Sequence, residues 1–205
     1  RLASNTTQIS IVSIGVIHIK TFLHVGYTKC ASSFLQQHYF IEENGFYELK
    51  RARLWRNFLY HQLCAAQTTY YDPAHPTLPD SQLFKKFNVG MSAEGFVCGD
   101  SIDYALALSR YKEIFPDTKV LVIIRNQQDL IFSHYIQMVK MGYSRSIDSH
   151  LKEIMWDSQQ SIWGTLSFAK VYEITKSIFD DVLMLPYEGI WEYEHFVGQL
   201  NNFFE

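Results

Sequence analysis

The stretch that decides the fold runs from Thr21 to Gln36 and reads TFLHVGYTKCASSFLQ. It begins with an apolar, β-prone segment, passes through a turn of small residues that contains Lys29, and then reads as a helix start at Ser32. A strand, a small-residue loop and a helix N-terminus favour phosphate binding, because the loop N–H groups point inward and the helix dipole attracts anions. Lys29 would add a mobile cation, and Ser32 and Ser33 would add hydroxyl donors.

A second stretch, Val120 to Tyr135, reads VLVIIRNQQDLIFSHY. Its uniformly apolar start predicts a central parallel strand that is covered on both faces. Arg125 follows this strand directly, and Ser133 lies eight residues further on, in a predicted helix. Ligands of open α/β sheets bind beyond the carboxyl ends of the strands. Arg125 and Ser133 are therefore predicted to converge on one anion.

The loop around Lys29 is not a Walker A motif, since Gly26 lies only three residues before Lys29 and Thr28 occupies the position of the second glycine. It resembles instead the 5′-phosphosulfate loop of sulfotransferases that use 3′-phosphoadenosine 5′-phosphosulfate (PAPS). That loop reads roughly P-K-[ST]-[GA]-[ST]-[ST]-x-L. Two positions of this chain depart from the pattern: Thr28 replaces the proline, and Cys30 replaces a small hydroxyl residue or glycine.

Two further motifs strengthen the resemblance. The segment from Val120 to Tyr135 is similar to the family's 3′-phosphate motif, which is a hydrophobic strand, R-[ND], and a serine eight residues after the arginine. The segment from Leu183 to Glu188 resembles the family's strand followed by Tyr-Glu. The three motifs stand in the family's order over residues 21–188.

The resemblance implies a PAPS-dependent sulfotransferase that needs no metal. The loop amides and serine hydroxyls would hold the 5′-phosphosulfate, and an arginine and a serine would hold the 3′-phosphate. An aromatic ring would lie against adenine, and a tyrosine would touch the nucleotide. Lys29 would also be catalytic, by stabilising charge on the bridging oxygen. The residues implied to bind the cofactor are Lys29, Cys30, Ala31, Ser32, Ser33, Phe34, Arg125, Ser133 and Tyr187.

Transfer also requires a general base that removes the acceptor's proton. The segment Phe96–Cys98 is predicted to be a strand, and the resemblance implies that such a strand end faces the acceptor. Asp100 follows it and is the first candidate. The alternative to catalysis is that Asp100 and Ser101 form the N-cap of a helix over residues 102–115. Four other residues stay open as the base: Asp103, Glu42, Glu43 and His38.

Alternating strands and helices predict an α/β fold, and the resemblance implies a P-loop-like three-layer arrangement with a central, mostly parallel sheet flanked by helices. We expect one domain over residues 1–205. The predicted strands lie within 9–25 and at 46–49, 96–98, 120–124 and 182–185. The predicted helices cover 32–43, 54–67, 81–91, 102–115, 128–141, 147–156, 166–179 and 190–204, and 68–79 is predicted to be a loop.

The bulk composition narrows the class of partner. The net charge of −3 disfavours nucleic acid. The three cysteines show neither a disulfide framework nor zinc spacing, which favours a reducing compartment such as the cytoplasm. No segment predicts a membrane span. The acceptor stays open among sugar, phenol, lipid and polyketide.

The sequence is also compatible with two other functions. One is a non-catalytic nucleotide-binding module of the same fold, and the other is a P-loop-type kinase. The chain begins at Arg1 rather than Met, and after Phe203 it lacks the basic segment with which many family members grip the 3′-phosphate. A segment missing at either end, including an anchor, therefore also stays open.

Overall fold

The computed structural model describes residues 20–49, 59, 61–65, 68–73, 80–98, 102–156 and 166–205. Over these residues, five strands form one parallel sheet in the order β2-β3-β1-β4-β5. This confirms the predicted α/β fold. The strands are β1 Thr21–Gly26, β2 Phe46–Glu48, β3 Asn88–Ser92, β4 Thr118–Ile124 and β5 Val182–Pro186.

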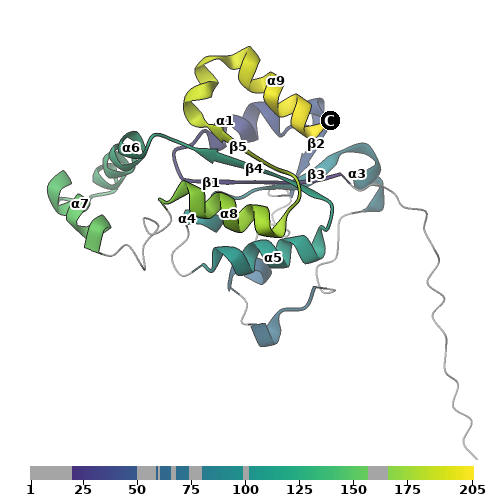
Figure 1. Cartoon of the computed structure of the whole chain (residues 1–205), viewed down its shortest axis with the longest axis horizontal. Helices are drawn as coiled ribbons and strands as arrows, with labels where there is room; N and C mark the ends of the chain where they lie inside the picture. The colour runs from purple at the N-terminus through teal and green to yellow at the C-terminus, as the bar shows by residue number, and fades with distance from the viewer. Residues whose placement is uncertain are drawn as a thin grey trace, which may run out of the picture.

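Helices cover both faces of the sheet, so the fold has three layers (Figure 1). Helices α1 and α9 lie over one face and α5 and α8 over the other, while α6 and α7 extend past the carboxyl ends of the strands. The α-helices are α1 Ser32–Phe34, α3 Ser81–Lys86, α4 Gly95–Cys98, α5 Tyr104–Ile114, α6 Gln127–Lys140, α7 Ile147–Trp156, α8 Phe168–Ile178 and α9 Tyr193–Phe204. No helix in the described ranges is long and apolar enough to cross a bilayer.

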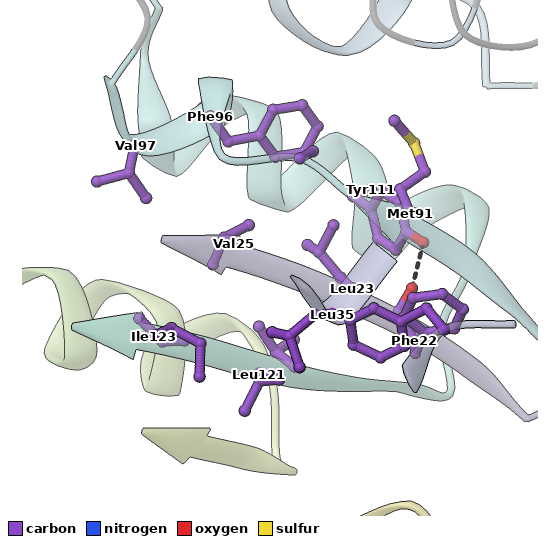
Figure 2. Close-up of a cluster of buried hydrophobic side chains, with 14 of the residues drawn as sticks. Phe22, Leu23, Val25, Leu35, Met91, Phe96, Val97, Tyr111, Leu121 and Ile123 are labelled. Carbon is purple, nitrogen blue, oxygen red and sulfur yellow. Dashed lines mark hydrogen bonds between the residues drawn. The ribbon is translucent and has the colours of Figure 1, made fainter. Parts of the chain in front are cut away.

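The central strand β1 is buried along its whole length, which fixes the position of the loop that follows it. The Phe22 ring stacks on Phe40 with centroids 4.6 Å apart and meets Phe46 edge-on at 5.3 Å. Figure 2 shows Phe22 among the side chains of the neighbouring strands and of α5. The Tyr111 hydroxyl donates to the Phe22 carbonyl at 2.8 Å. Burial raises the pKa of this phenol far above its usual value, so it stays protonated as a donor.

One predicted helix is partly wrong. The segment 81–91 is helical only as far as Lys86, and Asn88–Ser92 forms strand β3. Val89 and Met91 are buried in this strand. Gly90 lies so close to β1 that an added Cβ would be 1.8 Å from the Phe22 carbonyl oxygen. The pairing of this segment with β1 and β2 therefore decides its structure, and a strand's preference depends on such context.

The predicted strand Phe96–Cys98 is also wrong, because Gly95–Cys98 is the short helix α4. A brief apolar run bounded by glycine does not distinguish a buried strand from a buried helical turn. Asp100, whose assignment depended on that strand, lies outside the described residues.

Other predicted boundaries shift by a few residues or lie outside the described ranges. The helix predicted over 32–43 becomes α1 followed by a π-helical turn, Leu35–Tyr39, and a separate 3-10 turn, Glu42–Asn44. The last predicted helix begins as a 3-10 turn, Tyr187–Trp191, before α9. Most of 54–67 and residues 74–79 fall outside the description, although His61–Ala65 is helical.

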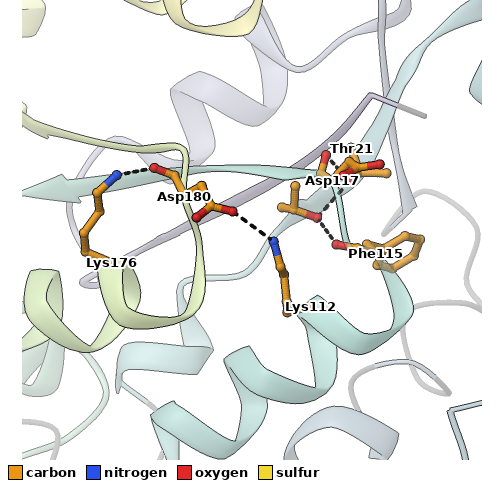
Figure 3. A network of polar contacts seen from close by, with 7 residues as sticks. Thr21, Lys112, Phe115, Asp117, Lys176 and Asp180 are labelled. Atoms are coloured by element: carbon orange, nitrogen blue, oxygen red, sulfur yellow. Dashed lines mark hydrogen bonds and ion pairs between the residues drawn. The ribbon is translucent and has the colours of Figure 1, made fainter. Parts of the chain in front are cut away.

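The amino ends of the strands are joined by a network of polar contacts (Figure 3). Thr21 bonds the Asp117 carbonyl at 3.0 Å and the Thr118 hydroxyl at 2.8 Å, which links β1 to β4. Lys112 of α5 lies 3.7 Å from Asp180, next to the start of β5. These contacts stabilise the amino ends of the strands, on the side of the sheet opposite to the carboxyl ends.

The close approach of β3 to β1 yields a stability prediction. Replacing Gly90 with alanine places a methyl group against the Phe22 carbonyl, and we expect the free energy of unfolding to fall by about 3 kcal/mol or more. The matched control is Gly198→Ala in α9, where an added Cβ meets no atom within 4 Å. It should raise stability by about 0.5–1 kcal/mol. Urea denaturation of both variants would measure this, and a Gly90→Ala protein as stable as wild type would contradict the pairing.

Candidate functional site

A cavity of about 630 Å³ lies at the carboxyl end of the sheet, where the loops after β1 and β4 separate. The chain leaves β1 toward β2 on one side and leaves β4 toward β5 on the other, and ligands bind in crevices of this kind. Eight of the nine residues predicted to bind the cofactor line this cavity. They are Lys29, Ala31, Ser32, Ser33, Phe34, Arg125, Ser133 and Tyr187. Three further residues line the cavity without having been predicted to bind the cofactor: Thr28, Glu94 and Gln137.

The loop after β1 has an unusual backbone. Lys29 and Ala31 have positive φ angles of 67° and 61°, and no other non-glycine residue in the described ranges has a positive φ. Left-handed residues alternating with right-handed ones turn successive N–H groups toward one concave point, which suits an anion. The side chain of Cys30 is only 1% exposed, so this residue can offer a ligand its backbone but not its thiol.

Arg125 connects the two halves of the cavity. Its Nη1 donates to the Lys29 carbonyl oxygen at 3.0 Å, and its guanidinium lies 4.6 Å from the centre of the Tyr187 ring. Its Nε is buried and makes no hydrogen bond with the described residues. A buried, unpaired donor on a cation costs free energy. An anion bound in the cavity would supply the missing acceptor.

The Tyr-Glu pair after β5 holds the start of α6. The Glu188 carboxylate accepts the Asn126 backbone N–H at 2.9 Å. The Asn126 side chain in turn caps α6 by accepting the N–H groups of Gln128 and Asp129 at 3.0 and 3.3 Å. The residue after Arg125 is thereby fixed on both sides, and the orientation of the helix is fixed with it.

Helix α6 presents polar side chains to the cavity. Ser133 and Gln137 are one turn apart, so they share a face of the helix, and both line the cavity. The helical spacing from Ser133 could have identified Gln137. Between them, His134 stacks on His150 with centroids 5.7 Å apart. Burial lowers the pKa of His134, and the nearby charges of His150 and Lys29 lower it further, so His134 is neutral at pH 7.

Glu94 lines the cavity and was not predicted from the sequence. It lies two residues after the end of strand β3, and its Oε2 accepts a hydrogen bond from the Ser32 hydroxyl at 2.8 Å. A carboxylate that follows a strand at the carboxyl edge of a sheet is a recognisable signal. The signal was hidden because β3 was predicted to be helical and the strand was placed at 96–98 instead.

The other carboxylates and the histidine that stayed open as the base do not line the cavity. Asp103 is the N-cap of α5 and accepts the Leu106 N–H at 3.0 Å. Glu42 and Glu43 lie in the exposed 3-10 turn, and His38 contacts Phe34 at 5.1 Å between ring centroids.

Comparisons with known proteins agree with this fold. Neither the search of protein-family models nor the search of curated proteins found a match. Among solved structures, the chain is similar to a sulfotransferase from Alicyclobacillus acidocaldarius, with a TM-score of 0.59 and 19% sequence identity. The match covers 90% of this chain and 80% of the other. At this identity, the similarity shows a shared fold.

The strained loop predicts a gain in stability on substitution. Ala31→Gly removes the Cβ from a left-handed residue, and we expect the free energy of unfolding to rise by about 0.5–1 kcal/mol despite the greater freedom of the unfolded chain. The control is Ala105→Gly within α5, which should lower stability by about 1 kcal/mol. Paired urea titrations would measure both. Equal losses in the two variants would show that residue 31 is not left-handed in solution.

Proposed function

We propose that this protein is a sulfotransferase that moves a sulfuryl group from PAPS to a hydroxyl or amine acceptor. One observation carries the proposal: a single cavity is lined both by the lysine loop after β1 and by Arg125 and Ser133 after β4. PAPS carries two separate phosphate-type groups, and the cavity offers a set of donors for each. The fold shared with a solved sulfotransferase supports the same reading.

The residues present fit PAPS. The backbone N–H groups of residues 29–33 would hold the 5′-phosphosulfate, with Ser33 as an exposed hydroxyl beside it. The 3′-phosphate would be held by Ser133 and by Arg125, whose buried Nε has no acceptor among the described residues. The rings of Phe34 and Tyr187 line the same cavity and would lie against adenine. A volume of about 630 Å³ is within the usual range for nucleotide-sized ligands.

Bound PAPS supplies the sulfuryl group: the acceptor oxygen or nitrogen bonds to sulfur while the bond from sulfur to the bridging oxygen breaks. Lys29 has a structural reason to act at that bridging oxygen. Its left-handed backbone is held by Arg125, and its exposed side chain belongs to the lining of the cavity. A cation placed at that oxygen stabilises the negative charge that grows as the bond breaks, which lowers the barrier without strengthening substrate binding.

Asp100, the first candidate for the general base from the sequence, lies outside the described residues, so the structure does not test it. The class of acceptor is a proposal that spans sugar, phenol, lipid and polyketide. The experiment that tests the function offers labelled PAPS to a panel of these acceptors and follows transfer of the label. A parallel arm offers labelled ATP and Mg²⁺. Sulfuryl transfer supports the proposal, phosphoryl transfer favours a kinase, and tight nucleotide binding with neither transfer favours a binding module.

The paired phosphate sites predict selectivity for the 3′-phosphate. Adenosine 3′,5′-diphosphate should bind at least about 10-fold more tightly than AMP, because a charge-assisted hydrogen bond contributes about 1.5–3 kcal/mol. Ser133→Ala should weaken binding of the diphosphate and leave AMP unaffected. It is a cleaner variant than Arg125→Ala, since Arg125 also bonds the Lys29 carbonyl. Calorimetry with both ligands measures this, and equal affinities in wild type would remove the 3′-phosphate assignment.

A role for Lys29 at the bridging oxygen predicts a loss of rate rather than of affinity. Lys29→Met keeps the length of the side chain and removes the charge, and we expect kcat to fall about 10²-fold or more. Affinity for adenosine 3′,5′-diphosphate should fall much less, because the loop amides, Ser33, Arg125 and Ser133 remain. Lys85→Met on the distant helix α3 is the control. A Lys29→Met protein that loses affinity but keeps kcat at saturation would make Lys29 only a phosphate ligand.

A further inference from the structure

The two adjacent serines of the loop have different surroundings. The Ser32 hydroxyl is in a residue that is only 7% exposed, and it donates to Glu94 Oε2 at 2.8 Å. Ser33 is exposed and its hydroxyl makes no hydrogen bond with the described residues. A hydroxyl has one proton to donate. While Ser32 donates to Glu94, it cannot donate to a phosphate oxygen.

The contacts of Glu94 orient its carboxylate and leave one of its oxygens able to accept a proton. One carboxylate oxygen, Oε2, accepts from Ser32, while Oε1 makes no hydrogen bond within the described part of the chain. The backbone next to it is fixed as well, since the Ala93 N–H donates to the His24 carbonyl of β1 at 2.7 Å. Among the described residues that line the cavity, Glu94 is the one carboxylate, and it shares the cavity with Lys29.

We propose that Glu94 is the proton acceptor for the incoming acceptor hydroxyl or amine, and that Ser32 is a positioning residue for Glu94 rather than a phosphate ligand. This rests on the proposed sulfuryl transfer. The proposal places the general base just after strand β3. It also gives the two loop serines different roles: Ser32 orients the Glu94 carboxylate, and Ser33 binds the phosphosulfate.

The proton balance is direct. As the acceptor oxygen bonds to sulfur, its proton passes to Glu94 Oε1, and the electron pair of the broken bond to sulfur leaves with the diphosphate product. The hydrogen bond from Ser32 keeps Oε2 occupied, which leaves Oε1 to receive the proton. Lys29 and Glu94 then act on opposite ends of the transfer, the leaving oxygen and the attacking oxygen.

The first test needs no turnover. Ser32→Ala and Ser33→Ala are matched variants that each remove one hydroxyl from neighbouring positions of the loop. Calorimetry with adenosine 3′,5′-diphosphate should give wild-type affinity within about 2-fold for Ser32→Ala, and about 10-fold weaker binding for Ser33→Ala. Equal weakening in both variants would make Ser32 a phosphate ligand and overturn its assignment to Glu94. This outcome does not depend on finding an acceptor.

The second test measures the pH dependence of kcat with labelled PAPS and an acceptor from the panel above. Glu94→Gln keeps the shape of the side chain and removes the base, so kcat should fall at least about 10²-fold and the decline of rate at acidic pH should disappear. Affinity for the diphosphate should be unchanged or tighter, because a negative charge leaves an anion site. Glu173→Gln on α8 is the control.

The outcomes separate the two proposals. Transfer by wild type together with full kcat in Glu94→Gln would overturn Glu94 as the base and leave the sulfotransferase proposal standing. Absence of transfer by wild type to every acceptor would overturn the proposed function, while the binding comparison of the two serine variants would still decide the role of Ser32. Ser32→Ala should also lower kcat by a smaller factor than Glu94→Gln, since it disturbs the orientation of the carboxylate without removing it.

Discussion

The hydrogen bond from Arg125 Nη1 to the Lys29 carbonyl oxygen is the contact on which the site depends. It joins the loop after β1 to the loop after β4 at the point where the two diverge. Arg125 is itself held from β5, by the ring of Tyr187 beneath its guanidinium and by Glu188 on the next backbone N–H. Three strand ends are thereby bound into one unit, and the left-handed backbone of Lys29 is held by contacts that come from outside its own loop.

Much of the site could be predicted from the sequence because its signals are local. Each signal lies within a short segment: one is the small-residue loop around Lys29, and the other is the spacing between Arg125 and Ser133. The structure brings these residues to one cavity. Strand β4 could be predicted for a similar reason, since a run of branched apolar residues buried on both faces has few other interpretations. The same run also places Arg125 at a strand end.

Strand β3 could not be predicted because it depends on a distant partner. Its sequence, NVGMS, is short and has a glycine at its centre, and it is a strand because Gly90 lets it approach β1 closely. Because β3 was not predicted, Glu94 was not predicted as a site residue either, since only its position after that strand identifies it. The different roles proposed for Ser32 and Ser33 could not be predicted for a related reason. The two residues are identical and adjacent, and they differ only in their surroundings in the fold.

The central position of β1 has a consequence for how the protein is made. Thr21 pairs with Val89 on one side and with Thr118 on the other, so the strand that carries the lysine loop acquires its neighbours only after much more of the chain has left the ribosome. Parallel pairings between distant segments form slowly, because the intervening chain must first be closed into a loop. Until β4 arrives, β1 has an unpaired apolar edge, and such edges recruit other chains. Aggregation during synthesis is therefore the hazard of this topology, and substitutions that slow the docking of β4 would reduce the yield of folded protein even where they leave its final stability unchanged.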